Sequence, residues 1–159
     1  MTNVRITLAG SGVEKPAIRR FVDQERLGQT VILEDWIPQD NLRLWYSAAD
    51  ALLLPSWNEP FGKVMIEAMS CGTPVIASAT EGPVDHVIHG KTGFLFPPRD
   101  RQALQRVLQL TMMQPLLVNH MRESALNYAT SSLTYKHIVS RVVKEVYEPI
   151  VRTSRCNEV

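Results

Sequence analysis

Short apolar segments with the composition of β-strands alternate along the chain with longer segments of helical periodicity. The strand-like segments are VRITLAG, TVILEDWI, DALLLPS, PVIAS and GFLFPP, which begin at residues 4, 30, 50, 74 and 93. Strands that are apolar on both faces and alternate with helices indicate a parallel sheet covered on both sides. We therefore predict an α/β domain with a Rossmann-like, doubly wound parallel sheet and helices on both faces.

Helix boundaries are marked by capping residues, glycine and proline. One predicted helix follows the third strand, begins near residues 60–62 and ends before Gly72. The other predicted helices cover residues 14–27, 41–49, 101–112 and 116–128, with Gly28 as a C-terminal stop and with Asp40 and Asp100 as N-caps.

The last predicted helix has the clearest period. Its apolar residues form a single stripe, which is typical of a helix packed on a surface. The length of the chain suits one domain, and we assign residues 1–152 to it and residues 153–159 to a disordered tail. The stripe consists of Tyr135, Ile138, Val139, Val142, Val143, Val146, Tyr147 and Ile150.

Two glutamates interrupt an otherwise apolar segment, PSWNEPFGKVMIEAMSCGTPVIAS, which runs from residue 55 to residue 78. Glu59 precedes the predicted helix and Glu67 lies inside it, four residues after Lys63. Gly62 leaves the first turn of this helix without a side chain. Unpaired N–H groups and the positive end of the helix dipole are exposed there, and these groups bind phosphate.

The spacing of the two glutamates suits a sugar linked to a nucleoside diphosphate. In a doubly wound fold, ligands bind beyond the C-terminal ends of the strands, where this helix begins. Glu67 lies about 7 Å along the helix from its first turn, within reach of a ribose diol when the phosphates sit at the helix start. Glu59 would then face the sugar. The alternative is a surface ion pair between Lys63 and Glu67, with Glu59 as a solvated loop residue.

At these residues the sequence resembles the retaining glycosyltransferases of family 4, the group 1 glycosyltransferases, which have the GT-B fold. Their signature is a glutamate, seven intervening residues and a second glutamate, which reads EPFGKVMIE from Glu59 to Glu67. The resemblance continues through DALLLPS upstream and through GPVDHVIHGKTGFLFPPRD downstream, and it covers nearly the whole chain.

The resemblance implies a role for each matching residue. Glu59 would be the catalytic residue that contacts the donor sugar, Glu67 would bind the ribose, and the loop with Ile37 would hold the base. The backbone N–H groups of residues 61–63 would hold the diphosphate. The donor, UDP- or GDP-linked, is the substrate, and no cofactor or metal is implied. The donor-binding residues would be Gly10, Gly12, Ile37, Pro60, Phe61, Gly62, Lys63 and Glu67.

The chain departs from the family pattern in two ways. These enzymes have two Rossmann-like halves, and this chain matches only the C-terminal, donor-binding half. The arginine and lysine that neutralise the diphosphate precede VRITLAG in the family, and no residue here takes that role. Glu81, Gly82 and Asp85 also stand where the family often has a Gly-Gly pair and a glutamate. We expect an excised or truncated half that is inactive without its N-terminal, acceptor-binding partner.

Composition and charge bear on the binding partners and the cellular location of the protein. Seventeen lysines and arginines against sixteen aspartates and glutamates give a formal charge of +1, which provides no footprint for nucleic acid or for a membrane surface. Cys71 and Cys156 match no metal or redox spacing, and Cys71 is expected to be buried. We expect a cytoplasmic location, at the inner face of the membrane if the missing half makes peripheral contact. The family's common use suggests cell-surface polysaccharide biosynthesis.

Other functions remain open on the same residues. Nucleotide-sugar 2-epimerases share the fold and a ribose-binding glutamate, and a degenerate half could serve as a non-catalytic interaction module. The AGSG turn lacks the third glycine of a dinucleotide-binding fingerprint. Trp45 is expected in the core, and His86 and His89 are expected to be structural. Trp57 suits either a ligand platform or packing.

Overall fold

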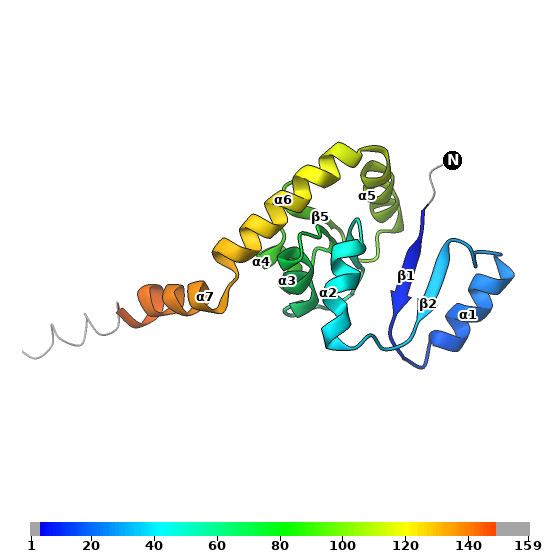
Figure 1. Ribbon diagram of the computed structural model, residues 1–159, viewed down its shortest axis with the longest axis horizontal. Helices are drawn as coiled ribbons and strands as arrows, with labels where there is room; N and C mark the ends of the chain where they lie inside the picture. The colour runs from blue at the N-terminus through cyan, green and yellow to red at the C-terminus, as the bar shows by residue number, and fades with distance from the viewer. Residues whose placement is uncertain (1–3, 149–159) are drawn as a thin grey trace, which may run out of the picture. The chain divides into compact units, whose positions relative to one another are not determined.

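The computed structural model describes residues 4–148. The chain divides into two compact units, Met1–Trp45 and Tyr46–Val159 (Figure 1). The predicted tail, Cys156 and Ile150 lie outside the described residues.

The first unit contains two parallel strands and one helix. Strand β1 (Ile6–Ala9) pairs with β2 (Val31–Glu34), and helix α1 (Lys15–Gln24) connects them. Residue 6 lies opposite residue 31 and residue 9 opposite residue 34. Helix α2 (Gln39–Ala48) follows β2 and crosses the boundary between the two units.

The second unit contains a three-stranded parallel sheet in the order β3-β4-β5. All four residues of the central strand β4 are buried, as expected for a parallel strand covered on both faces. A methionine-rich layer is fully buried between α3 and α6, and it contains Met65, Met69 and Met121. The remaining elements are β3 (Leu52–Leu54), α3 (Lys63–Ser70), β4 (Val75–Ser78), α4 (Glu81–His86), β5 (Gly93–Phe96), α5 (Arg101–Met113), α6 (Pro115–Ser132), α7 (Tyr135–Val142) and a π-helix (Val143–Tyr147).

The predicted fold class is confirmed, because parallel strands alternate with helices throughout the described residues. The strands form two sheets, β1-β2 and β3-β4-β5, where we expected one. Both sheets have the strand direction and the crossover helices of a doubly wound fold.

Two helix boundaries match their sequence signals. The side chain of Asp100 accepts a hydrogen bond from the N–H of Ala103 at 2.8 Å and caps α5. After α3, Gly72 adopts φ 73°, and the N–H of Thr73 donates to the carbonyl of Ala68 at 3.0 Å. This is a Schellman motif with glycine at its left-handed position, as the sequence predicts.

Two other boundaries differ from the prediction. Helix α1 ends at Gln24, and the left-handed residue is Arg26, with φ 55°, where we expected Gly28. The N–H of Leu27 donates to the carbonyl of Val22 at 2.8 Å, so a Schellman motif closes the helix before the glycine is reached. Helix α2 begins at Gln39, so Asp40 lies inside its first turn and is not its N-cap.

The predicted packing of the last helix is wrong for the residues that the structure describes. Helix α6 extends to Ser132, beyond the predicted end, and α7 and the π-helix follow. The described members of the apolar stripe are exposed. They are Tyr135, Ile138, Val139 and Val143. Hydrophobic periodicity predicts the helix, but it does not predict which surface covers the stripe.

Candidate functional site

The loop of residues 55–62 leaves the C-terminal end of β3 and leads into α3. Gly62 is the N-cap of α3 and adopts φ 74° and ψ 50°, a left-handed conformation that favours glycine. A Cβ atom at this position would lie 2.1 Å from Cε of Met65. The left-handed conformation therefore disfavours a side chain at the start of this helix, and a Cβ atom would also require the terminal methyl group of Met65 to move.

Glu59 holds this loop through two hydrogen bonds. Its Oε1 atom accepts from the N–H of Gly62 at 2.7 Å, and its carbonyl accepts from the N–H of Gly82 at 2.8 Å. Gly82 lies in the first turn of α4, where a Cβ atom would lie 2.6 Å from the carbonyl carbon and oxygen of Phe61. Helix α4 therefore packs directly against the loop backbone.

The contact between Glu59 and Gly62 bears on the predicted diphosphate site. We expect the N–H of Gly62 to bind a phosphate, and in this structure the Glu59 carboxylate occupies it. A carboxylate there is an anion at the positive end of α3, in the place that a phosphate oxygen would take. A phosphate that binds to this N–H must displace the carboxylate.

Glu67 is held from two sides. Its Oε1 atom lies 3.6 Å from Nζ of Lys63, and its Oε2 atom accepts from the hydroxyl of Tyr46 at 3.4 Å. The Glu67 side chain is 23% exposed, so a ligand can reach it. The ion pair of Lys63 and Glu67, which the sequence offers as the alternative to a ligand-binding role, is formed. The contact of Glu67 with Tyr46 could not be predicted from the sequence.

Tyr46 takes the core position that we expected for Trp45, whose exposure is 39%. Neighbouring residues on a helix point about 100° apart, so only one of the two can face α3. Burial raises the pKa of Tyr46 to about 12, and the charge and hydrogen bond of Glu67 add to the rise. The phenol therefore remains protonated at neutral pH and donates to the Glu67 carboxylate.

The end of α2 is anchored so that Tyr46 keeps this position. The hydroxyl of Thr73 donates to the carbonyl of Tyr46 at 2.5 Å. The guanidinium of Arg122, on α6, donates to the carbonyl of Ala49 at 2.7 Å and to that of Ser47 at 3.0 Å. These carbonyls end the helix, where intrahelical partners are lacking, so a cation there also complements the helix dipole.

The two histidines near the site differ in their surroundings. The ring of His86 meets the edge of Phe61, with ring centroids 5.1 Å apart, and its Nδ1 atom is buried without a hydrogen-bond partner among the described residues. Burial lowers the pKa of His86, against the opposing charge of Asp85. His89 is structural, because its Nδ1 atom accepts from the N–H of Leu95 at 3.0 Å.

An exposed aromatic residue lies on the same loop as Glu59. Trp57 is 70% exposed, and the guanidinium carbon of Arg99 lies 4.5 Å from the centroid of its ring. Arg99 follows β5 and adopts φ 64°, which is rare for a residue with a side chain. The sequence singles out Trp57, but nothing in it indicates this partner.

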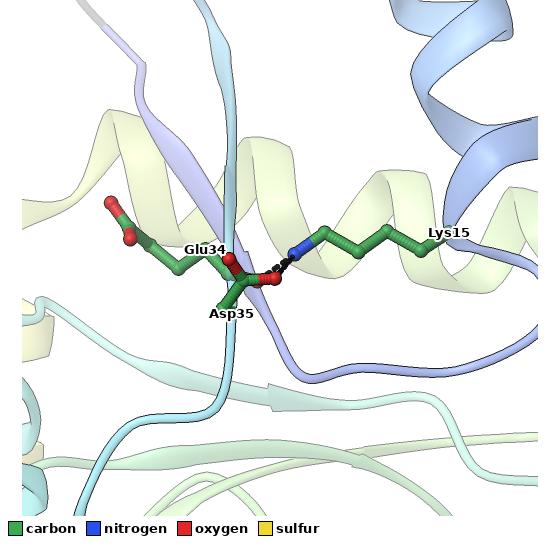
Figure 2. Close-up of polar contacts among 3 residues, drawn as sticks. All are labelled: Lys15, Glu34 and Asp35. Atoms are coloured by element: carbon green, nitrogen blue, oxygen red, sulfur yellow. Dashed lines mark hydrogen bonds and ion pairs between the residues drawn. The ribbon is translucent and has the colours of Figure 1, made fainter.

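In the first unit, an ion pair connects the start of α1 with the end of β2 (Figure 2). The ammonium of Lys15 donates to the carbonyl of Glu34 at 2.8 Å and to the carboxylate of Asp35. The side chain of Lys15 is mostly buried and that of Asp35 is exposed. The hydrogen bond and charge of Lys15 lower the pKa of Asp35, and Arg19 adds a smaller effect.

The predicted residues of the first unit lie near this pair. Gly10 and Gly12 line a hollow of about 300 Å³ together with Lys15 and the first turn of α1. Gly10 has φ 138°, which requires glycine. Ile37 is half-buried and follows Asp35 by two residues. Lys15 therefore fixes the backbone that leads into the Ile37 loop.

The predicted site residues fall into both compact units. Gly10, Gly12 and Ile37 belong to the first unit. The structure brings the remaining ones together at the C-terminal end of β3 and the first turns of α3. These residues are Glu59, Pro60, Phe61, Gly62, Lys63 and Glu67.

No metal-binding arrangement is seen among the described residues, where no group of three or more His, Cys, Asp or Glu side chains is suitably placed. Within residues 4–148, each helix is too short or too polar to cross a membrane. Cys71 is a half-buried free thiol, less buried than we expected.

A helix whose N-terminus is opened by glycine, at the C-terminal edge of a parallel sheet, is a common phosphate-binding position in α/β domains. The family profile of the group 1 glycosyl transferases matches residues 1–128. The chain belongs to this family and has the fold of the C-terminal domain of GT-B glycosyltransferases.

Known relatives agree with this assignment. A D-inositol 3-phosphate glycosyltransferase from Streptomyces avermitilis is 36% identical over 122 residues, which are 76% of this chain and 26% of that protein. The structure of a sucrose-phosphate synthase from Thermosynechococcus elongatus is 31% identical, with a TM-score of 0.78 over 94% of this chain and 39% of that one. Anabaena HepE in complex with UDP-glucose is 23% identical, with a TM-score of 0.78 over 91% of this chain and 41% of that one. The chain thus spans about a quarter of the length of the Streptomyces avermitilis protein.

Proposed function

We propose that the chain is the donor-binding half of a retaining glycosyltransferase, which transfers a hexose from a nucleotide sugar to an acceptor. The observation that carries the proposal is the arrangement around α3. The Glu59 carboxylate already accepts a hydrogen bond from the N–H of the left-handed Gly62. A second carboxylate, Glu67, is held further along the same helix by Tyr46 and Lys63. This arrangement offers a binding site for an anion at the start of the helix and, further along it, a carboxylate that can accept hydrogen bonds from hydroxyl groups.

In this proposal the diphosphate displaces the Glu59 carboxylate from the N–H of Gly62. The released carboxylate, still fixed through its backbone bond to Gly82, then accepts hydrogen bonds from the hydroxyls of the donor sugar. The exchange replaces one anion by another at the same N–H, so that group remains satisfied throughout. In this proposal the Glu59 carboxylate contacts the sugar only after a diphosphate has displaced it from the Gly62 N–H.

The remaining groups stabilise the leaving nucleoside diphosphate. Negative charge grows on the leaving phosphate as the glycosidic bond breaks, and N–H groups that are already oriented stabilise it without reorganisation. The N–H groups of Phe61, Gly62 and Lys63 and the positive end of α3 would supply this stabilisation. The hydroxyls of the ribose would donate to Glu67, whose carboxylate is oriented by Tyr46.

The donor and the rest of the enzyme are also part of the proposal. The UDP-glucose bound to Anabaena HepE favours a UDP-linked donor, with GDP-linked donors next. We also propose that the acceptor is bound by another half of the same enzyme, because this chain covers only 26% of the length of the D-inositol 3-phosphate glycosyltransferase. We further propose a cytoplasmic location for the enzyme and a role in polysaccharide synthesis.

Nuclear magnetic resonance would test the proposal directly. UDP, GDP, ADP and CMP would be titrated separately, into the millimolar range, into the labelled chain. We expect selective amide shifts at residues 61–67 with one nucleotide, and loss of these shifts in Glu67→Ala. Glu123→Ala, an exposed glutamate on α6, is the matched control and should behave like the parent chain. Absence of shifts at residues 61–67 with all four nucleotides would refute the proposal.

A further inference from the structure

The ends of helices α2 and α3 are connected by one buried residue. Glu67 lies on α3, and its partner Tyr46 lies on the last turn of α2. The N–H of Thr73 donates to the carbonyl of Ala68, near the end of α3, at 3.0 Å. The hydroxyl of the same residue donates to the carbonyl of Tyr46 at 2.5 Å. Thr73 is fully buried, so it ties together the two helices that carry the phenol and the carboxylate.

Arg122 ties the same end of α2 to α6. One guanidinium nitrogen donates to the carbonyl of Ala49 at 2.7 Å and the other to the carbonyl of Ser47, the residue after Tyr46, at 3.0 Å. The planar fork of an arginine holds two acceptors in one geometry, which an ammonium cannot do. The main chain of Arg122 lies beside the end of α3, because a Cβ atom at Gly72 would lie 3.8 Å from its carbonyl oxygen. Arg122 therefore lies where α2, α3 and α6 meet.

The position of Tyr46 beside Glu67 is fixed by contacts within the second unit. Tyr46, Glu67, Thr73 and Arg122 all belong to that unit. The carbonyl of Tyr46 and the two carbonyls bound by Arg122 come from the end of α2, where a helix lacks partners of its own for these groups. The tertiary contacts therefore decide where this helix end, and the phenol on it, is held.

Recognition of a ribose requires a fixed orientation of the Glu67 carboxylate. Two neighbouring hydroxyls can donate to one carboxylate together only if its oxygens keep one orientation. The Tyr46 hydroxyl, which donates to the Oε2 atom of Glu67 at 3.4 Å, provides that orientation. Productive geometry of this kind must be held within about 0.5 Å. Movement of Tyr46 should therefore reduce the preference for ribose over 2′-deoxyribose more than it reduces binding of the diphosphate.

We propose that Arg122 is a positioning residue for ribose recognition, which holds Tyr46 against Glu67 from a third helix. The inference rests on the proposed function, because that function places the ribose on Glu67. It adds a residue outside the donor site that sets how well the site discriminates between sugars. The sequence gives no signal for it, since 73 positions separate Arg122 from Ala49.

The first test compares the affinities of UDP and GDP with those of their 2′-deoxy forms, by nuclear magnetic resonance titration of the full chain. We expect the parent chain to bind the ribose forms at least about tenfold more tightly, because the deoxy forms lack a hydroxyl that donates to a charged acceptor. Arg122→Ala should reduce this ratio of affinities at least about threefold, while the shifts of residues 61–63 upon nucleotide addition persist. Arg122→Lys keeps the cation without the fork and should give an intermediate ratio.

A double-mutant cycle tests whether Arg122 acts through Tyr46. Tyr46→Phe removes only the hydroxyl and should reduce the ratio at least as much as Arg122→Ala does. In the Tyr46→Phe background, Arg122→Ala should cause no further reduction. Independent and additive effects of the two substitutions would overturn the inference.

The Tyr46 phenol provides a readout that needs no nucleotide. Burial and the neighbouring Glu67 raise its pKa to about 12. Release of the end of α2 in Arg122→Ala should lower the pKa of Tyr46, which the carbon signals of the ring report during titration. Val107→Ala is the control for a general loss of stability, because Val107 packs on the core from α5. It should lower the melting temperature but change neither the pKa of Tyr46 nor the ratio of affinities.

The possible failures can be told apart. A folded Arg122→Ala chain with the parent ratio or an unchanged pKa of Tyr46 would overturn the inference and leave the proposed function intact, as would equal effects of Arg122→Ala and Val107→Ala. Shifts at residues 61–67 with equal affinity for both forms in the parent chain would refute the ribose role of Glu67 and the inference with it. Absence of a response to every nucleotide would refute the proposed function itself.

Discussion

The hydrogen bond between Glu59 and Gly62 leads to a prediction that runs against simple expectation. A glutamate in a binding site is usually required for affinity, and its removal weakens binding. Here its Oε1 atom lies 2.7 Å from the backbone nitrogen that the diphosphate needs. Glu59→Gln keeps the shape and an acceptor oxygen but removes the charge, so it should bind a nucleoside diphosphate more tightly than the parent chain.

The magnitude follows from the strength of the bond to be broken. A hydrogen bond to a charged group contributes about 1.5–3 kcal/mol, and one between neutral groups about 0.5–1.5 kcal/mol. The phosphate therefore displaces glutamine at a cost about 1 kcal/mol lower than glutamate, which corresponds to roughly fivefold tighter binding. Removal of the repulsion between carboxylate and diphosphate acts in the same direction. The extra affinity that a nucleotide sugar has over its nucleoside diphosphate should fall in the same variant.

Isothermal titration and amide shifts would measure both affinities, with Glu123→Gln as the control of equal charge change. The melting temperature of Glu59→Gln should fall by about 2–4 °C if the weaker cap costs about 1 kcal/mol. Weaker binding of the nucleoside diphosphate by a folded Glu59→Gln chain would refute the displacement of one anion by another. Unchanged binding would show that the phosphate does not use the Gly62 N–H.

Three further predictions concern packing, backbone strain and titration. In Gly82→Ala, the new Cβ atom would lie 2.6 Å from the Phe61 carbonyl group, so the loop must shift. We expect the amide shifts of residues 61–67 upon nucleotide addition to be lost, while circular dichroism shows a folded chain. Arg26→Gly relieves the left-handed residue after α1 and should stabilise the chain by about 1 kcal/mol in urea unfolding, whereas a loss of stability would contradict the assigned cap. The pKa of Tyr46 is raised to about 12, so its contribution to stability is complete below pH 10 and is lost as the pH rises towards 12. Tyr46→Phe should lack this part of the alkaline decline, and parallel declines in both chains between pH 10 and 12 would disprove the assignment.

Local sequence signals predict much of the fold. The apolar strand segments give β1–β5, and Asp100 and Gly72 mark the ends of their helices as predicted, because capping involves residues only a few positions apart. The wrong prediction for the end of α1 arises because two local capping arrangements compete there. Arg26 closes α1 before Gly28 is reached, since a Schellman motif tolerates a strained residue when its hydrogen bonds and tertiary contacts stabilise it.

The candidate site divides in the same way. The positions of Gly62, Lys63 and Glu67 on one short helix follow from the sequence, and so does the pair that the latter two form. The contact of Tyr46 with Glu67 and that of Gly82 with the Phe61 backbone connect residues about 20 positions apart. No periodicity or spacing rule relates such residues, because the distance between them depends on how whole elements pack.

The sequence by itself determined the alternation of strands and helices, the family, and the helix that carries the glutamate pair. These depend on side-chain period, backbone preference and short-range hydrogen bonds, all of which are written in neighbouring residues. Only the tertiary structure decided that Glu59 occupies the Gly62 N–H, that Tyr46 rather than Trp45 supports Glu67, and that Arg99 covers Trp57. Each of these depends on the rotamer of a side chain or on a meeting of distant loops, and close packing of the assembled chain selects among the alternatives.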